Sequence, residues 1–527
     1  MRRRRRGLSY LPPEPTRTSF LIYLLVAGLC FGAIFFFKNQ IIKPVSGKIL
    51  DAYSGKPVIG ATVLLENDQR LSKTASISNI LTTVTDLDGS FSFDKATDNL
   101  TLNVSANYYI PEKVKANPSA TISISLRPSI LRGIVKDSQG KAIAHASVTS
   151  GDKNVLTDLD GSYVINDVPE EGQLVVKAAG YKPATVAFKR TQTQDVTVKN
   201  LVVKGIYLRA AVVADGANFQ NILNLISVTE LNTVVIDLKD SNGWTYYDSK
   251  NPLARPAPEG KGKIPNLPAV VKSLKEKDIY TIARISVFQD ASLTDVKPEW
   301  AIKSRSTGKL WADSARFNWA NPYLKEVWDY NIDLAREAAA SGFDEIQFAF
   351  VQFPASGQIA DIDYGRSSNT ESRVLSINGF LKEANLQLNK LGVFVSVEVM
   401  GQSVLESGDL GIGQDISQIA DQVDYISPVL FPSYFGANSF GFANPASQPY
   451  EVINKSLTYA RTKLEGKRAQ MRPWLQDFSA EGSTYNAPEV RAEIQATEDV
   501  ATNNKVVANW LLWNSEARYT AAALRKK

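Results

Sequence analysis

Cysteine and histidine are almost absent from this sequence, which has one of each among 527 residues. The single cysteine, Cys30, lies in an apolar segment near the N-terminus, so no disulfide can form within the chain. The single histidine, His145, lies in the first third. The C-terminal part therefore holds neither a Ser-His-Asp nor a Cys-His catalytic set, and no histidine-ligated zinc site.

Positive and negative residues nearly balance along the chain except at its start, where Arg2 to Arg6 carry five positive charges, as many as the whole net charge of +5. Such a run suits nucleic acid or an acidic membrane surface. The segment 18–37 that follows has no charged residue and is long enough for a helix to cross a ~30 Å hydrocarbon core. This favours a membrane anchor and no nucleic-acid partner.

The positive-inside rule predicts where the two ends of that anchor lie. Basic residues predominate before the apolar segment, which places the arm 1–17 in the cytoplasm and the bulk of the chain outside it. A cleaved signal peptide is the alternative, but the apolar run exceeds the usual length of 7–15 residues and no small-x-small site follows it. We expect a single-pass protein of the cell membrane.

An internal repeat follows the apolar segment. Residues 45–65 are echoed by 131–150, and "TDLDGSFSF" at 85–93 recurs as "TDLDGSYVI" at 157–165. Short alternating strands with Asp-Gly and Ser-Gly turns predict two small antiparallel β-sandwiches, 45–128 and 129–203. The paired aspartates of each motif lack the spacing of a calcium loop, so we interpret them as turn residues and expect neither metal nor cofactor.

From residue 204 to 527, short apolar runs alternate with helical stretches. The predicted strands are 204–213, 233–240, 280–288, 345–353, 392–400, 424–431, 472–478 and 509–514. Eight such alternations predict a (β/α)8 TIM barrel, whose sites lie at the carboxyl ends of the strands. An open doubly wound sheet is the rival fold, but no glycine-rich phosphate loop follows any strand.

The predicted strand ends carry polar and aromatic side chains that suit a carbohydrate, because flat rings stack on sugars while amides and carboxylates bind hydroxyls. All eight tryptophans lie between Trp244 and Trp513, in the barrel segment. As catalytic candidates we name Glu398, Asp237 and Asp240. As substrate-binding candidates we name Arg284, Gln347, Tyr434, Arg472, Trp474, Gln476, Asp477 and Trp513.

The two repeat segments resemble carboxypeptidase regulatory-like domains. The barrel segment contains "TELNTVVIDLKDSNG", "GFDEIQFAFVQFP", "YISPVLFPSYF" and "RPWLQDFSA". With these motifs, residues 204–514 resemble a glycoside hydrolase-like domain of bacterial membrane-anchored proteins, long filed as a domain of unknown function. The resemblance implies a glycosidase-type TIM barrel whose partner is a polysaccharide or cell-envelope glycan.

One catalytic position departs from the family pattern. The fourth strand of that family reads "FDEIQFDYVRFP", whereas this chain has Ala349 and Gln352 at the second aspartate and the arginine. Glycoside hydrolysis normally needs two carboxyl groups, and a methyl group cannot replace one. Two readings stay open: a hydrolase using Glu398 with Asp237, Asp240 or Asp477, or a non-catalytic carbohydrate-binding or envelope-structural protein.

Overall fold

The computed structural model describes residue 26 and residues 43–67, 81–96, 100–116, 121–259, 262–480, 483–502 and 506–527. These form two compact units, one built on the first sandwich and one that joins the second sandwich to the barrel. The predicted arm 1–17 and membrane segment 18–37 lie, Val26 apart, outside the described residues. Within those ranges, no helix has the length and apolar character needed to cross a membrane.

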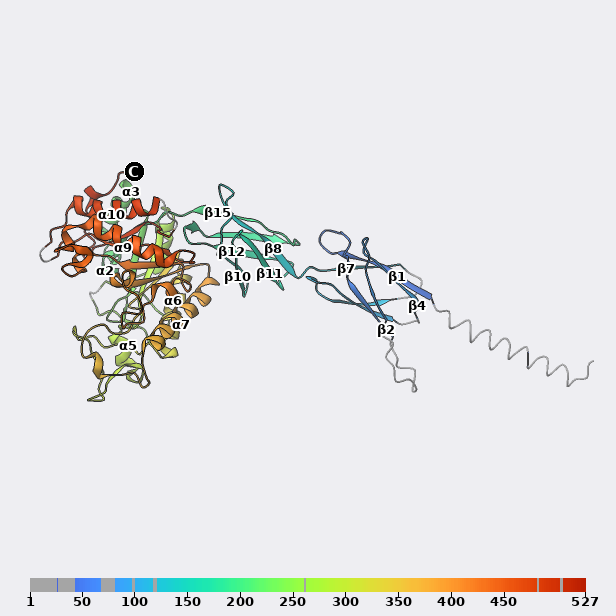
Figure 1. Cartoon of the computed structure of the whole chain (residues 1–527), viewed down its shortest axis with the longest axis horizontal. Coiled ribbons are helices and arrows are strands. Elements are labelled where there is room, and N and C mark those ends of the chain that lie inside the picture. Colours follow the sequence, from blue (N-terminus) through green and yellow to red (C-terminus); the bar gives the residue numbers. More distant parts are fainter. Residues whose placement is uncertain are drawn as a thin grey trace, which may run out of the picture. The chain divides into compact units, whose positions relative to one another are not determined.

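The first sandwich has two sheets, as its repeat predicts (Figure 1), but it is not wholly antiparallel, because its first and last strands pair in parallel, as do the first and last strands of the second sandwich. One has the strand order β4-β1-β7 and the other β3-β2-β5-β6. The strands are β1 (Lys43–Asp51), β2 (Thr62–Asn67), β3 (Leu81–Val84), β4 (Ser90–Ala96), β5 (Leu100–Ser105), β6 (Glu112–Ala116) and β7 (Thr121–Leu126). Alternate residues of β5 are buried, which places one face of its sheet on the core.

The second sandwich also has two sheets, of orders β10-β9-β12-β14 and β11-β8-β15-β13. Its strands are β8 (Ile130–Asp137), β9 (Ser147–Ser150), β10 (Lys153–Leu156), β11 (Ser162–Asn166), β12 (Glu171–Lys177), β13 (Tyr181–Lys182), β14 (Ala184–Lys189) and β15 (Val196–Asn200). The repeated motif has the same place in both sandwiches: residues 85–93 lead into β4, and residues 157–165 lead into β11.

The repeated motif is structural in both sandwiches. The buried Thr85 hydroxyl donates to the Val58 carbonyl at 2.6 Å and accepts from the Ala61 amide at 2.8 Å. Thr157 forms the same pair of bonds in the second sandwich, with the Ile143 carbonyl and the Ala146 amide. The threonine thus ties the Asp-Gly turn to the neighbouring loop, which is why the motif recurs.

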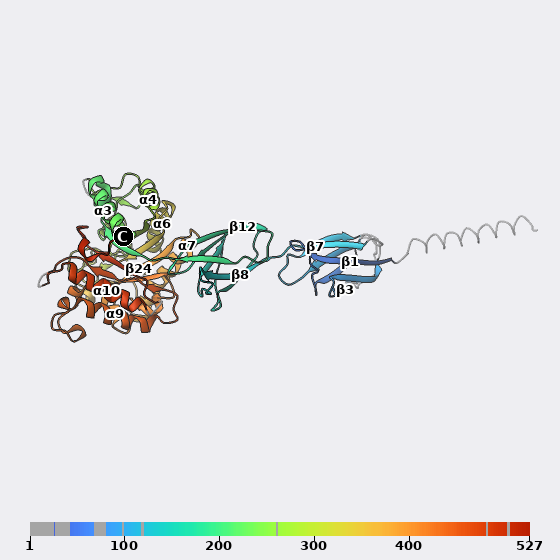
Figure 2. The same ribbon diagram turned by 90° about the horizontal axis from the view of Figure 1, so that it is seen from above.

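The C-terminal part is a closed TIM barrel, as predicted. Neighbouring strands are parallel around the ring, and β16 pairs with both β17 and β28, which closes it. In ring order the strands are β16 (Lys204–Leu208), β17 (Thr233–Lys239), β20 (Tyr280–Ser286), β22 (Glu345–Ala349), β24 (Phe394–Met400), β25 (Tyr425–Val429), β27 (Trp474–Gln476) and β28 (Trp510–Trp513). Figure 2 shows the helices around them.

Helices and short strands complete the barrel. The α-helices are α2 (Ala210–Ala214), α3 (Gly216–Val228), α4 (Leu267–Lys275), α5 (Ala291–Val296), α6 (Lys325–Ala340), α7 (Thr370–Asn389), α8 (Ile416–Ile419), α9 (Pro449–Leu464) and α10 (Ala487–Thr502). The short strands are β18 (Trp244–Thr245), β19 (Arg255–Pro256), β21 (Lys303–Ser304), β23 (Ile362–Asp363) and β26 (Gln470–Met471). The 3-10 turns are η1 (Pro298–Trp300), η2 (Ile359–Asp361), η3 (Gly401–Val404), η4 (Pro432–Tyr434), η5 (Ser439–Gly441), η6 (Pro445–Ser447) and η7 (Ala521–Ala523).

All eight predicted strands were longer than the observed ones, and the fourth ends at Ala349 instead of residue 353. The first ends at Leu208, and the apolar residues after it form the short helix α2. The seventh, predicted as 472–478, is limited to β27, because Pro473 just before it has no backbone N–H for the ladder. In both strands the loop after the carboxyl end therefore begins earlier than predicted, after Leu208 in the first and after Gln476 in the seventh.

The barrel interior is polar on alternate residues. On β22, Ile346 and Phe348 belong to the core between strands and helices, where Phe348 meets Phe380 of α7 at 5.1 Å. Glu345, Gln347 and Ala349 lie on the other face, inside the ring, and are fully buried. Glu345, Gln347 and Ala349 therefore share one face of β22, the face inside the barrel.

The second sandwich is joined to the base of the barrel by a buried lysine. Lys177, at the end of β12, donates to the Val393 carbonyl and lies 3.4 Å from Asp424, just before β25. Asp424 also accepts from Arg468. Burial lowers the pKa of Lys177 to about 8, although Asp424 opposes the shift.

We expect Lys177→Ala to lower the free energy of unfolding by about 2–3 kcal/mol, because it leaves a buried carboxylate with one cation instead of two. Thermal or denaturant unfolding measures the change. Lys182→Ala is the matched control, since the Lys182–Asp278 pair has side chains 51% and 90% exposed and should cost under about 1 kcal/mol. Equal effects of the two changes would contradict the joining role of Lys177.

Candidate functional site

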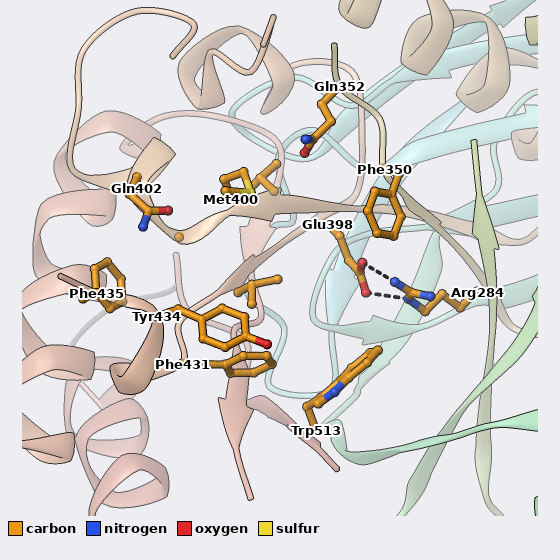
Figure 3. Close-up of a pocket in the computed structure, with 13 residues that line it drawn as sticks. Arg284, Phe350, Gln352, Glu398, Met400, Gln402, Phe431, Tyr434, Phe435 and Trp513 are labelled. Carbon is orange, nitrogen blue, oxygen red and sulfur yellow. Dashed lines mark hydrogen bonds and ion pairs between the residues drawn. The ribbon is translucent and has the colours of Figure 1, made fainter. Parts of the chain in front are cut away.

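A pocket of about 540 Å3 opens at the carboxyl ends of the barrel strands (Figure 3). Its wall is mainly apolar and aromatic, which is typical of a small-molecule or sugar site. The lining residues are Arg284, Phe350, Gln352, Glu398, Val399, Met400, Gly401, Gln402, Val429, Phe431, Tyr434, Phe435 and Trp513. This is the end of the barrel where TIM-barrel enzymes place their sites.

Arg284 of β20 binds two carboxylates at the floor of the pocket. Its Nε and Nη2 donate to the two oxygens of Glu398 at 2.7 and 2.8 Å, and its Nη1 donates to Asp237 at 2.8 Å (Figure 3 shows the pair with Glu398). The three side chains come from three different strands of the ring. The barrel therefore brings together three residues that the sequence analysis named as site candidates: Glu398, Asp237 and Arg284.

Aromatic rings support this ion cluster. The rings of Trp513 and Tyr207 stack at 3.9 Å, and the Arg284 guanidinium lies 5.2 Å from the Trp513 ring. The Tyr207 hydroxyl donates to Asp237. Cation–π contact and the hydroxyl thus add to the ion pairs that hold Arg284 in place.

The two acids differ in access. Glu398 lines the pocket, whereas Asp237 does not and is reached through Arg284. Burial raises the pKa of Asp237, and the Arg284 guanidinium opposes that rise. Both oxygens of Glu398 accept from N–H groups, which is the arrangement of a carboxylate and not of a proton donor.

Ala349 lies beside Glu398 at the end of the neighbouring strand. Gln347 pairs with Ser396 and Phe348 with Val397, so the same register brings Ala349 next to Glu398. The following residue, Phe350, has a φ of 51°, a strained conformation for a bulky side chain. The strand therefore turns sharply where the family carries its second acid, and the ring of Phe350 lines the pocket.

Four of the predicted site residues line the pocket: Arg284, Glu398, Tyr434 and Trp513. Of these, Tyr434 is the most open, with 61% of its surface exposed. Arg284 already donates to the carboxylates of Glu398 and Asp237, so its main interactions are with the protein and not with a substrate. In Figure 3 the rings of Tyr434 and Trp513 both lie below the Glu398 carboxylate, with Tyr434 farther to the left.

Five other predicted residues lie inside the protein. Gln347 donates to Ser427 at 3.1 Å, and Gln476 accepts from Ser433 at 2.8 Å. Arg472 is fully buried in an ion pair with Glu345, while Trp474 packs against Tyr207 and Trp513. Asp477 accepts from the Thr520 hydroxyl at 2.6 Å, and burial raises the pKa of that carboxyl.

The last catalytic candidate, Asp240, belongs to a turn. It accepts from the amides of Asn242 and Trp244 and from the Tyr246 hydroxyl. These bonds shape the loop between β17 and β18, and Asp240 is not among the residues that line the pocket. Among the described residues, no group of three or more His, Cys, Asp or Glu side chains is arranged to hold a metal ion.

Sequence reasoning missed most of the apolar wall. Phe350, Met400, Phe431 and Phe435 line the pocket. Phe350 directly follows β22 and Met400 ends β24, whereas Phe431 and Phe435 lie in the loop after β25, in the motif "YISPVLFPSYF". A rule that counts aromatic residues in the loop after each strand would have found the three phenylalanines.

Comparison with known families gives two matches. The family model described as "Putative glycosyl hydrolase domain" matches residues 205–519. The model described as "Carboxypeptidase regulatory-like domain" matches residues 130–204, the second sandwich. No curated protein matches the chain.

Several solved structures are similar to this one. A hypothetical protein from Ruminiclostridium thermocellum is 34% identical, with 36% of this chain and 96% of that chain covered and a TM-score of 0.32. A spore cortex-lytic enzyme from Bacillus cereus is 10% identical, with 61% and 72% covered and a TM-score of 0.37. An exo-β-N-acetylglucosaminidase from Vibrio harveyi is 11% identical, with 91% and 94% covered and a TM-score of 0.39.

Proposed function

This chain belongs to the "Putative glycosyl hydrolase domain" family, and on that premise we propose that its barrel mouth binds a carbohydrate that it cleaves weakly or not at all. The observation that carries the proposal is the pocket itself: ring faces surround a single accessible carboxylate, Glu398. Rings and one acid suffice to bind a sugar, whereas hydrolysis normally uses two carboxyl groups.

The loss of hydrolysis follows from the position of the second acid. The family's fourth-strand acid would lie beside Glu398, where this chain has Ala349. Asp237 is the nearest substitute, but Arg284 lies between it and the pocket and binds both carboxylates. Asp237 is held by Arg284 and does not line the pocket, so Glu398 has no second carboxyl group with which to cleave a glycosidic bond.

A hydrolase that uses Glu398 with Asp237 is the second candidate. It is favoured by the contact of both carboxylates with one guanidinium, which brings them within roughly the 5–9.5 Å that glycosidases use. The raised pKa of Asp237 also suits a proton donor. This reading requires Arg284 to move when substrate binds.

We also propose that the protein is anchored in the cell membrane and acts on envelope or extracellular polysaccharide. Support comes from the basic run before the uncharged segment 18–37. Protease added to intact cells is expected to degrade the sandwiches and the barrel. Full protection of both in intact cells, with degradation after lysis, would contradict this location.

Binding is tested on residues 45–527 with a panel of envelope and plant glycans. We expect Tyr434→Ala to weaken binding of the captured glycan about tenfold, because an exposed ring that stacks on a sugar contributes on the order of 1 kcal/mol. Tyr459→Ala is the matched control: Tyr459 is 56% exposed on α9 and does not line the pocket. Calorimetry gives the affinities.

The same panel separates the two candidates. Binding without cleavage by wild type supports the proposal, whereas cleavage that is abolished by Glu398→Gln establishes the hydrolase. Equal loss of binding in both tyrosine variants would show that the glycan binds elsewhere.

A further inference from the structure

Negative charge exceeds positive charge at the floor of the pocket, although the floor contains an arginine. Of the thirteen lining residues, only Arg284 and Glu398 carry a charge, and no lysine is among them. Asp237 adds a second carboxylate just behind Arg284. One cation therefore faces two acids, and the floor has no excess positive charge.

The fork of Arg284 that is formed by Nε and Nη2 is already occupied by Glu398. An arginine binds a carboxylate or phosphate best through two parallel N–H bonds. All three nitrogens of Arg284 already donate to protein carboxylates, at 2.7, 2.8 and 2.8 Å. Its guanidinium also lies near the rings of Trp513 and Tyr207, at 5.2 and 6.0 Å. An incoming acid that binds through Nε and Nη2 would have to displace Glu398, and elsewhere on Arg284 it would lie close to two carboxylates.

Glu398, in contrast, still has acceptor capacity toward the pocket. A carboxylate has about four lone-pair sites, and Arg284 occupies two of those of Glu398. In Figure 3 the carboxylate faces Arg284, with Phe350 above it and Trp513 below it, and all of these residues line the pocket. A hydroxyl or ammonium group donates to such a carboxylate, whereas a carboxylate, sulfate or phosphate is repelled by it.

We propose that this pocket selects a neutral or amino sugar and rejects acidic sugars. The inference rests on the proposed function and names the chemical class of its ligand. Uronic acids and sulfated or phosphorylated sugars would bring a third negative group to a floor with one cation. An amino sugar would add a second cation next to Glu398, so it should bind at least as well as its neutral counterpart.

The test keeps the glycan backbone constant and changes its charge. Once the panel has identified a bound backbone, its neutral, amino and uronate forms are compared by calorimetry on residues 45–527, at low and at raised ionic strength. The β-1,4-linked glucose, glucosamine and glucuronate oligomers are one such series. We expect the uronate form to bind at least about tenfold more weakly than the neutral form, with the gap narrowing at high salt.

Two variants connect the selectivity to the pocket. Glu398→Gln removes the facing charge and should reduce the gap between neutral and uronate forms. Gln402→Lys adds a cation to the half-buried rim and should favour the uronate form, with Arg284 and its two partners left in place. Unchanged melting temperatures show that each variant is folded.

The outcomes are distinguishable. A uronate or sulfated form that binds wild type as tightly as the neutral form would overturn the inference and leave carbohydrate binding intact. A gap that persists unchanged in both variants would place the selectivity outside this pocket and would also overturn it. Binding by no glycan at all would remove the proposed function and the inference with it.

Discussion

Arg472→Met is expected to lower the free energy of unfolding by about 3–5 kcal/mol, because it leaves Glu345 as a buried, unpaired carboxylate. Both side chains are fully buried, and two guanidinium nitrogens of Arg472 lie 3.1 to 3.2 Å from the Glu345 oxygens. The Tyr280 hydroxyl also donates to Glu345 at 3.0 Å. Denaturant unfolding followed by tryptophan fluorescence measures the loss.

A double variant supplies the control. Glu345→Gln removes the orphaned charge, so Glu345→Gln with Arg472→Met should recover much of the stability that Arg472→Met alone loses. Affinity for the bound glycan should be unchanged in whatever fraction of Arg472→Met is folded. Weakened binding at full stability would instead support the sequence-based role of Arg472 as a ligand residue.

Ala349→Asp is expected to raise hydrolysis of the bound glycan by about 10²–10³-fold. A well-placed catalytic group contributes on the order of 3–4 kcal/mol to transition-state stabilisation, and the strand register sets residue 349 beside Glu398. Release of reducing ends by the variant and by wild type, at equal protein concentration, measures the gain.

Ala349→Asn is the matched control for this change. It adds nearly the same volume without a carboxylate and should give no gain, while Ala349→Asp combined with Glu398→Gln should lose the gain again. No increase in a folded Ala349→Asp protein would show that a second departure, such as Gln352 in place of the family's arginine, also disables hydrolysis.

Much of the barrel could be predicted from local pattern. Parallel strands buried on both faces leave short apolar runs, and helices between them leave a longer period, so all eight strands were located. Their ends were less certain. Residues 210–213 are apolar, yet they belong to α2 because the strand ends at Leu208. Tertiary packing, not propensity, decides such a boundary.

The sequence predicted which kinds of side chain the site would contain, but not which of the candidate residues would line it. Polar residues at strand ends indicated a polar mouth, and four of them line the pocket. Arg472 was named on the same pattern, yet it pairs with Glu345 in the buried interior. A one-dimensional pattern cannot distinguish two layers of one interior face, because the layer depends on how far each strand is staggered against its neighbour.

The sequence alone indicated the order of domains and the eight strands of the barrel, and it determined the absence of an acid at position 349, because each follows from local period or residue identity. Only the tertiary structure decided that Arg284 binds Glu398 and Asp237 together. Those residues are up to 161 positions apart, since 398 − 237 = 161. Contacts across a ring arise from register and closure, which no stretch of sequence contains by itself.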